Sequence, residues 1–150
     1  METVALDAPD GGCEMKTKNT THLAGEFLVA GELSRRNYPV SITMGNAKSV
    51  DIYVEAGNRT LIKIDAKASR SKTNWPISEK SIRDDVFYVF VYLGSDHSIR
   101  VFSPPEYYIV LGKELKANDL ISTWNTRKGV KYASLNNNDY RDRWSKIPPP

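Results

Sequence analysis

Three charged residues at one end of a short stretch have the types and spacing for metal-assisted chemistry. Asp51 begins a run of β-branched and apolar residues, and Asp65 and Lys67 lie near the end of the next such run. The residues between the runs, Ala56–Arg59, include Gly and Asn, so Val50–Ser69 has the pattern of a β-hairpin. Alternation places Asp65 and Lys67 on one face, and antiparallel pairing brings that end back to Asp51. The stretch therefore predicts two carboxylates and an ammonium group together, which suits a divalent metal beside a fixed cation.

The segment before the hairpin has the pattern of an amphipathic helix. It begins near Thr20 or Thr21, either of which can cap it, and ends at Asn37, a residue type that adopts the left-handed conformation found after helices. Glu26 and Glu32 are spaced along this helix, so either carboxylate is a candidate to reach the hairpin. Apolar residues at helical spacing predict a buried stripe formed by Leu23, Phe27, Ala30 and Leu33.

The ordered set of Glu26, Asp51 and the run Asp65-Ala66-Lys67 resembles the PD-(D/E)xK nuclease superfamily, and is similar to its small members such as archaeal Holliday-junction resolvases. Val50 stands where a proline usually precedes the first Asp of the motif. The resemblance implies an α/β (α+β) fold with a restriction-endonuclease-like αβββαβ core, in which helices flank a central mixed sheet. It also implies that the second helix of this core is shortened to about Ser78–Asp85.

The resemblance implies a site and a reaction as well. Asp51 and Asp65 would hold Mg²⁺, for which Mn²⁺ would substitute, with the main-chain carbonyl of Ala66 as a further ligand and Glu26 acting through water. Lys67 would orient or deprotonate the attacking water or neutralise charge on the phosphate, and these roles stay open. The expected activity is metal-dependent endonucleolytic hydrolysis of DNA with low or structure-based specificity. The alternative is a catalytically silent nuclease-like binding module or subunit in a defence or mobile-element system.

Basic and aromatic residues close to the motif are candidate contacts for the DNA backbone and bases. They are Lys48, Ser49, Arg70, Lys72 and Trp75. The alternative interpretation is a solvated strand end and loop. The net charge of +3 and the isoelectric point near 8.9 permit nucleic-acid binding without arguing strongly for it. RNA stays open as a substrate.

Length and composition predict one globular domain. Its expected bounds are residues 20–147, preceded by a flexible N-terminal tail over residues 1–19 and followed by a proline tail over residues 148–150. No apolar run reaches the roughly 18 residues of a membrane helix, and the acidic N-terminus does not have the pattern of a signal peptide. The single cysteine, Cys13, cannot form an internal disulfide. The expected location is the cytoplasm.

The remaining elements are predicted from local patterns. We expect strands over Tyr38–Met44, Val86–Leu93 and Ser98–Phe102, helices from Pro104 to Leu111 and from Ala117 to Thr126, and a closing helix or turn over Tyr140–Ile147. The run from Val86 is apolar throughout, which is typical of a central strand. Cutting both strands of a duplex needs two sites, so a homodimer is expected, with Tyr107, Tyr108 and Trp124 at its interface. His22 and His97 are interpreted as surface residues.

Overall fold

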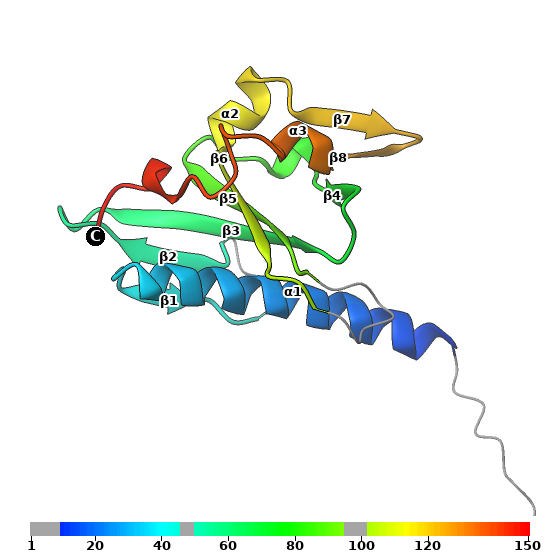
Figure 1. The fold of residues 1–150 in the computed structure, drawn as a ribbon, viewed down its shortest axis with the longest axis horizontal. Helices are drawn as coiled ribbons and strands as arrows, with labels where there is room; N and C mark the ends of the chain where they lie inside the picture. Colours follow the sequence, from blue (N-terminus) through cyan, green and yellow to red (C-terminus); the bar gives the residue numbers. More distant parts are fainter. Residues whose placement is uncertain (1–9, 46–49, 95–101) are drawn as a thin grey trace, which may run out of the picture.

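The fold is built on a five-stranded mixed sheet, here called the central sheet, with strand order β1-β2-β3-β5-β6 (Figure 1). The computed structural model describes residues 10–45, 50–94 and 102–150, with side chains from residue 19 onward. β1 (Val40–Ile42), β2 (Ile52–Glu55) and β3 (Leu61–Ser69) are antiparallel neighbours. β5 (Val86–Tyr92) is parallel to β3 and antiparallel to β6 (Glu106–Leu111). The predicted α+β fold with a mixed central sheet flanked by helices is confirmed at this level.

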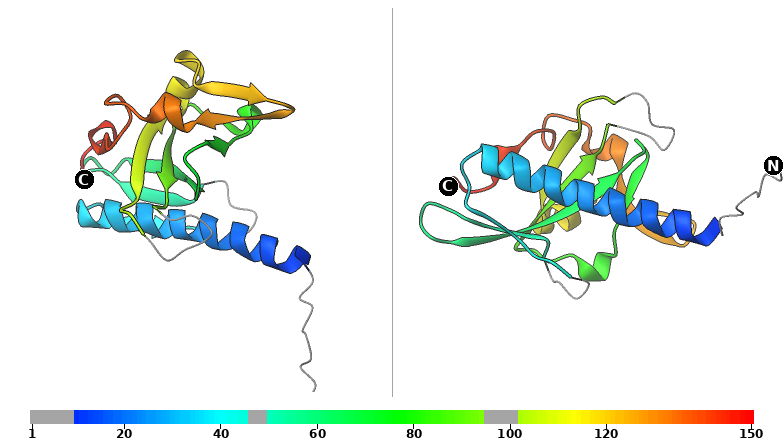
Figure 2. Two further views of the ribbon diagram at one scale, coloured as in Figure 1. Left: turned by 45° about the vertical axis from the view of Figure 1, so that its right-hand side comes forward. Right: turned by 90° about the horizontal axis from the view of Figure 1, so that it is seen from below.

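One long helix, α1 (Asp10–Arg35), lies across one face of the central sheet (Figures 1 and 2). Its fully buried residues Val29 and Leu33 belong to the same core cluster as Ile52 and Ile64 of the sheet. The helix begins at Asp10, before the predicted start near Thr20 or Thr21, and residues 1–9 of the expected tail lie outside the described residues. The predicted end is confirmed, because Asn37 adopts a φ of 67° immediately after the last turn.

The buried stripe predicted for this helix is only half right. Ala30 and Leu33 are buried, whereas Leu23 and Phe27 are 42% and 56% exposed. Gly25, which lies between them on the helix, packs on Ala68 of β3, so this part of α1 lies over the sheet and Leu23 and Phe27 lie on its outward side. The residue that turns inward at this level is Glu26, which is 2% exposed. Periodicity alone could not show which residues lie over the sheet.

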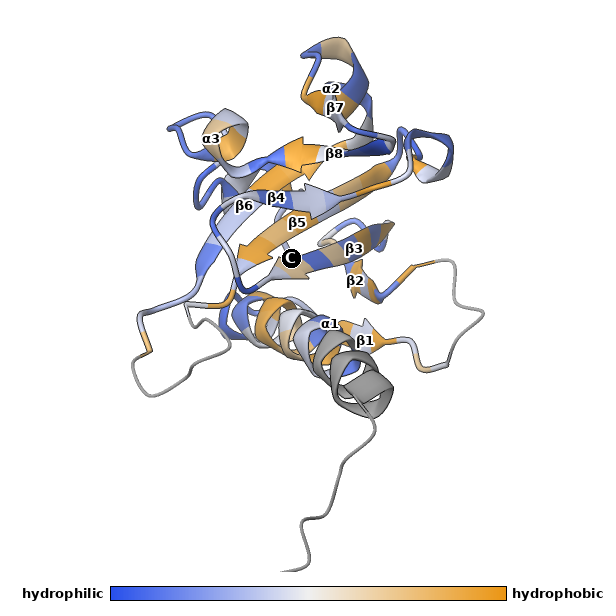
Figure 3. Ribbon diagram, turned by 90° about the vertical axis from the view of Figure 1, so that its right-hand side faces the viewer, coloured by the Kyte–Doolittle hydropathy of each residue, from blue (hydrophilic) through white to orange (hydrophobic). Residues whose placement is uncertain are grey.

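A second layer covers the other face of the central sheet. It contains a three-stranded sheet of β4 (Asn74–Pro76), β8 (Arg127–Lys131) and β7 (Ile121–Trp124), with the short helices α2 (Gly112–Ala117) and α3 (Tyr132–Leu135). These elements enclose a second apolar cluster around the inward-facing side chains of β5 and β6. Because both faces of β5 are covered, its predicted central position is confirmed, and Figure 3 shows it as a hydrophobic strand between the layers.

Two helices expected in the C-terminal half are strands instead. The residues after Pro104 and Pro105 form β6, because their aromatic and β-branched side chains pair with β5 and pack on both of its faces. The segment expected as a helix from Ala117 to Thr126 ends α2 and then forms β7, which pairs with β8 through a turn at Asn125, where φ is 53°. The strand predicted from Ser98 falls mainly on residues 95–101, outside the described residues.

The connection from β3 to β5 contains β4 and one 3₁₀ turn, η1 (Glu79–Ser81). The shortened helix expected over about Ser78–Asp85 is thus a single 3₁₀ turn of three residues. The restriction-endonuclease-like core therefore remains a prediction in its specific form.

The C-terminal segment is held against the body of the protein. A 3₁₀ turn, η2 (Trp144–Lys146), follows a short bridge to β6, which confirms the closing turn. The Tyr38 hydroxyl donates to the carbonyl oxygens of Ile147 and Pro148, at 3.2 and 2.9 Å, and the Gly57 amide donates to Pro149. Residues 148–150, expected as a proline tail, are thus hydrogen-bonded to Tyr38 and Gly57. In the part of the chain that the structure describes, no helix has the length and apolar character needed to cross a bilayer.

Candidate metal centre

The β2–β3 hairpin brings Asp51 beside Asp65, as the sequence predicted. Ile52 pairs with Ile64, so Asp51 lies opposite Asp65 just outside the end of β2. The Asp51 carboxylate accepts a hydrogen bond of 2.9 Å from the Ala66 amide, and the side chain is only 4% exposed. A backbone hydrogen bond of 2.9 Å from the Thr43 amide to the Asp51 carbonyl fixes the main chain there. Asp51 is therefore a rigidly placed, buried acid.

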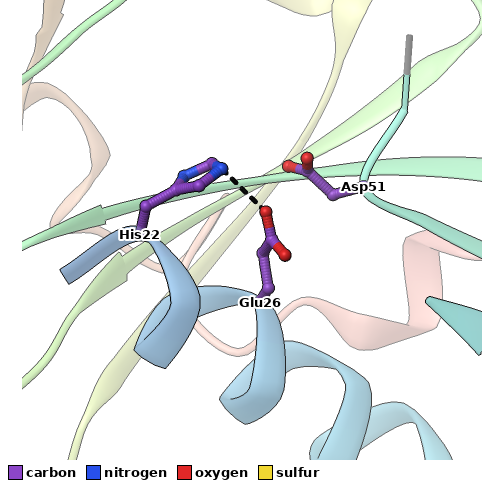
Figure 4. Close-up of side chains that lie close together, drawn as sticks. All are labelled: His22, Glu26 and Asp51. Atoms are coloured by element: carbon purple, nitrogen blue, oxygen red, sulfur yellow. Dashed lines mark ion pairs between the residues drawn. The ribbon is translucent and has the colours of Figure 1, made fainter. Parts of the chain in front are cut away.

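Helix α1 brings Glu26 to the same place. The adjoining Gly25 packs directly on β3, where a Cβ atom at this position would lie 2.5 Å from the Cβ atom of Ala68. The Glu26 carboxylate lies 2.7 Å from Nε2 of His22, one turn earlier on the helix. One ligand atom from each of His22, Glu26 and Asp51 lies within 4.8 Å of the others (Figure 4). These three residues are candidates to hold a metal ion and are called the metal centre below.

Asp65 and Lys67 come from the face of the central sheet opposite to α1. In the parallel register they pair with Tyr88 and Phe90, whose side chains belong to the second apolar cluster. Nζ of Lys67 lies 3.0 Å from a carboxylate oxygen of Asp65, and Asp65 is hydrogen-bonded to Asp51. Asp65 thus contacts the metal centre through Asp51, and it lies outside the group of three within 4.8 Å.

These surroundings shift the pKa of the Asp65 carboxyl group. Burial, followed by the hydrogen bond and negative charge of Asp51, raises the pKa of Asp65 to about 7, and the attraction of Lys67 offsets only part of this rise. The raised pKa of Asp65 means that carboxyl groups are held close together at a point with little water. A cation bound between them would relieve the repulsion.

The residues present fit a divalent metal. Ligand atoms about 2.1 Å from one ion lie within about 4.2 Å of each other, so the three donors need only small side-chain movements to bind together. Glu26 and Asp51 are both almost completely buried, and two adjacent buried carboxylates are costly unless a cation neutralises them. An imidazole nitrogen with two carboxylate oxygens suits Mn²⁺ and similar ions as well as Mg²⁺.

Of the four metal ligands expected from the sequence, Glu26 and Asp51 belong to the group of three, whereas Asp65 and Ala66 do not and His22 was not among them. Glu26, rather than Glu32, is the helix carboxylate that reaches Asp51, because Glu32 pairs with Arg35 and Arg36 at 2.9 and 3.6 Å. His22, interpreted as a surface residue, is half-exposed but belongs to the metal centre. Its spacing of four residues from Glu26, which puts both side chains on one helix face, is the signal that could have revealed it.

The expected DNA contacts divide into three groups. The prediction that Trp75 stacks on DNA bases is wrong, because Trp75 is only 1% exposed. Its indole nitrogen donates a hydrogen bond of 3.1 Å to the carbonyl oxygen of Val91. Arg70 and Lys72 have partners within the protein: Arg70 donates to the Thr21 hydroxyl, and Lys72 binds Glu106 at 2.8 Å. Lys48 and Ser49 lie outside the described residues.

The expected dimer interface is also incorrect in its main residues. Tyr108 is fully buried and Tyr107 is 7% exposed within the single chain, so their aromatic rings pack in its own core. Tyr107 stacks against Trp144 with ring centroids 5.3 Å apart. Trp124 is partly exposed on β7. Two of the three aromatic residues therefore stabilise the fold and cannot form a surface for a second copy.

The comparisons with known proteins identify no relative. No protein-family model matches the chain, and no curated protein or solved structure is significantly similar to it. The interpretation of the site consequently depends on the geometry and chemistry given above.

Proposed function

We propose that this protein is a metal-dependent nuclease that hydrolyses DNA phosphodiester bonds, as the sequence resemblance to the PD-(D/E)xK nucleases implies. The observation that carries the proposal is the meeting of Glu26 and Asp51, both buried, with Asp65 and Lys67 on the next strand. Each of these side chains alone has an ordinary structural explanation. Linked through the contact between Asp51 and Asp65, they supply the carboxylates and the ammonium group that a phosphodiester-cleaving site needs.

The side chains have separate tasks in such a reaction. A bound Mg²⁺ or Mn²⁺ would supply charge neutralisation for the phosphate and a water of lowered pKa. Glu26, Asp51 and His22 are the residues that would hold it, and the Ala66 amide keeps the Asp51 carboxylate in place. Lys67, anchored by Asp65 at 3.0 Å, presents an ammonium group to the phosphate or to the attacking water.

The direct test is a cleavage panel of single-stranded, duplex, flapped and four-way DNA. With Mg²⁺ or Mn²⁺ we expect cleavage of at least one substrate, and none in the presence of EDTA. The variant Lys67→Ala should lose activity by about a hundredfold or more, because a positioned charge or proton-transfer group contributes that much. A matched control is Lys63→Ala, since Lys63 lies on the same strand but pairs with Asp85 at 2.8 Å.

The second candidate is a nuclease-like module that binds without cutting. It is favoured by the net charge of only +3 and by the internal partners of Arg70 and Lys72, which compete with a phosphate backbone for these two cations. Metal binding without cleavage of any substrate in the panel would support this module and contradict the enzyme.

A homodimer is part of the proposal, because one site of this kind cuts one strand at a time. Light scattering at micromolar concentration should give a mass near twice the 16.9 kDa of the chain. A monomer that nevertheless cuts both strands of a duplex at one position would contradict this part.

A further inference from the structure

A cavity of about 360 Å³ adjoins the metal centre between α1 and the residues that follow β1. Two of its lining residues, His22 and Glu26, belong to the metal centre itself. Leu23 and Met44 give it an apolar wall, and Asn19 and Thr43 provide polar groups. Its volume lies at the lower end of the range for small-molecule sites.

The side chains of the apolar wall are exposed. Leu23 is 42% and Met44 is 77% exposed, whereas Val29 and Leu33 on the same helix are fully buried. Covering exposed apolar surface gains about 25 cal/mol for each Å² removed from water. A ligand that fills the cavity would therefore gain binding energy from these two side chains.

The position of the cavity restricts what that ligand can be. Because His22 and Glu26 line the cavity and also belong to the metal centre, a group in the cavity and a group at the metal centre contact the same two side chains and would be neighbouring parts of one ligand. If the group at the metal centre is a phosphodiester, its neighbour is a nucleoside. A base inside a duplex is paired and stacked, so only an unpaired nucleotide can enter such a cavity without an additional cost.

We propose that this cavity binds the nucleoside next to the phosphate that is cut, so that the enzyme acts on unpaired nucleotides. Leu23 and Met44 contact the sugar and the base, and the Asn19 amide, which can donate and accept hydrogen bonds, is available to the edge of the base. This assignment depends on the proposed nuclease function and adds the class of substrate to it.

The test compares two small phosphodiesters that differ in carrying a nucleoside: thymidine 5′-(p-nitrophenyl) phosphate and methyl p-nitrophenyl phosphate. In both, water adds to phosphorus, the bond to the nitrophenyl oxygen breaks, and p-nitrophenolate leaves while the proton passes to solvent. The quantity measured is the ratio of kcat/KM for the thymidine ester to that for the methyl ester, with Mn²⁺ present. The variants are Leu23→Ala and Met44→Ala, and the control is Phe27→Ala, which removes an exposed side chain of α1 outside the cavity.

We expect the ratio to exceed one for the wild type and to fall about tenfold in Leu23→Ala and Met44→Ala, the size of effect typical for apolar contacts in a pocket. Phe27→Ala should keep the wild-type ratio. An equal loss on both esters, or an unchanged ratio, would overturn the nucleoside site while leaving the nuclease intact. Failure of the wild type to cleave either ester or any DNA would overturn the nuclease proposal and this assignment with it.

Discussion

Asp51 is the residue at which the metal interpretation can be separated from a structural one. Its carboxylate faces Glu26 and Asp65, and it also accepts a hydrogen bond from the Ala66 amide. In Asp51→Asn the amide oxygen can keep that hydrogen bond while one negative charge is removed. Without metal, the variant should therefore melt at or above the wild-type temperature, because repulsion between the carboxyl groups falls.

The melting temperatures of the wild type and Asp51→Asn should also respond differently to divalent metal. Mn²⁺ should raise the melting temperature of the wild type by linkage and that of Asp51→Asn little or not at all, and the variant should lose cleavage. Differential scanning fluorimetry with and without EDTA measures both effects. If the variant is destabilised and still responds to metal like the wild type, Asp51 is a structural residue only.

We expect His22 to influence which divalent ion the proposed centre prefers. The imidazole nitrogen is a better ligand for Mn²⁺ or Co²⁺ than for Mg²⁺ or Ca²⁺, which favour oxygen. In His22→Asn the affinity for Mn²⁺ should fall by about tenfold or more, while that for Mg²⁺ changes less. Isothermal titration with the two ions gives both constants. Equal losses for the two ions would contradict a ligand role for His22.

At the scale of elements, the contact between α1 and β3 sets the geometry of the site. In Gly25→Ala the new methyl group would lie 2.5 Å from the Cβ atom of Ala68, so the helix must move away from the strand. We expect a loss of about 1–3 kcal/mol in stability from this overpacking and weaker metal binding, because Glu26 moves with the helix.

The same helix offers a matched control. Gly31→Ala meets no atom within 4 Å, so it should stabilise the protein by about 0.5–1 kcal/mol through helix propensity and leave metal binding unchanged. Urea denaturation of both variants, with a metal titration of each, checks the pair. A tolerated Gly25→Ala with unchanged metal binding would show that the position of α1 on β3 is not critical.

Local patterns predicted some elements well and others poorly, for physical reasons. The β2–β3 hairpin and the central position of β5 follow from a Gly-Asn turn and a continuous apolar run, which few other structures accommodate. β6 and β7 were mistaken for helices because short apolar segments fit both periods, and pairing with distant strands decides between them.

Some residues of the candidate site could likewise be predicted from local patterns, and others could not. Asp51, Asp65 and Lys67 come together through one hairpin, a local structure that the sequence can predict. Glu26 required a choice between two helix positions, and His22 required knowing that this part of α1 lies over the end of β2. The burial of Trp75 depends on the small sheet, which no pattern near that residue indicates.

At the scale of the whole molecule, Glu106 joins elements of the two layers. Its carboxylate accepts hydrogen bonds from Lys72, Tyr108 and Tyr132. Burial by itself raises the pKa of Glu106, but these hydrogen bonds outweigh it and lower the pKa to about 2. The carboxylate therefore stabilises the folded protein above its unfolded-state pKa near 4.5, and this contribution is lost as the pH falls toward 2.

The lowered pKa of Glu106 gives a prediction for the pH dependence of stability. Glu106→Gln should cost about 2 kcal/mol at pH 6, the scale of hydrogen bonds to a charged group, and the difference from the wild type should shrink between pH 4.5 and 2. Urea unfolding at several pH values measures it. A difference that stays constant on acidification would show that the charge of Glu106 contributes nothing to stability.

The burial of Trp75 between the layers provides an optical signal. Its indole ring lies 5.5 and 5.8 Å from the rings of Phe90 and Tyr108 in the central sheet, and 6.1 Å from the ring of Tyr132 in α3. Aromatic rings held rigidly at such distances give near-ultraviolet circular dichroism that disappears when fixed packing is lost. Because none of these rings belongs to the metal centre, the signal reports the association of the two layers in any variant of His22, Glu26 or Asp51, and it separates loss of metal binding from loss of the fold.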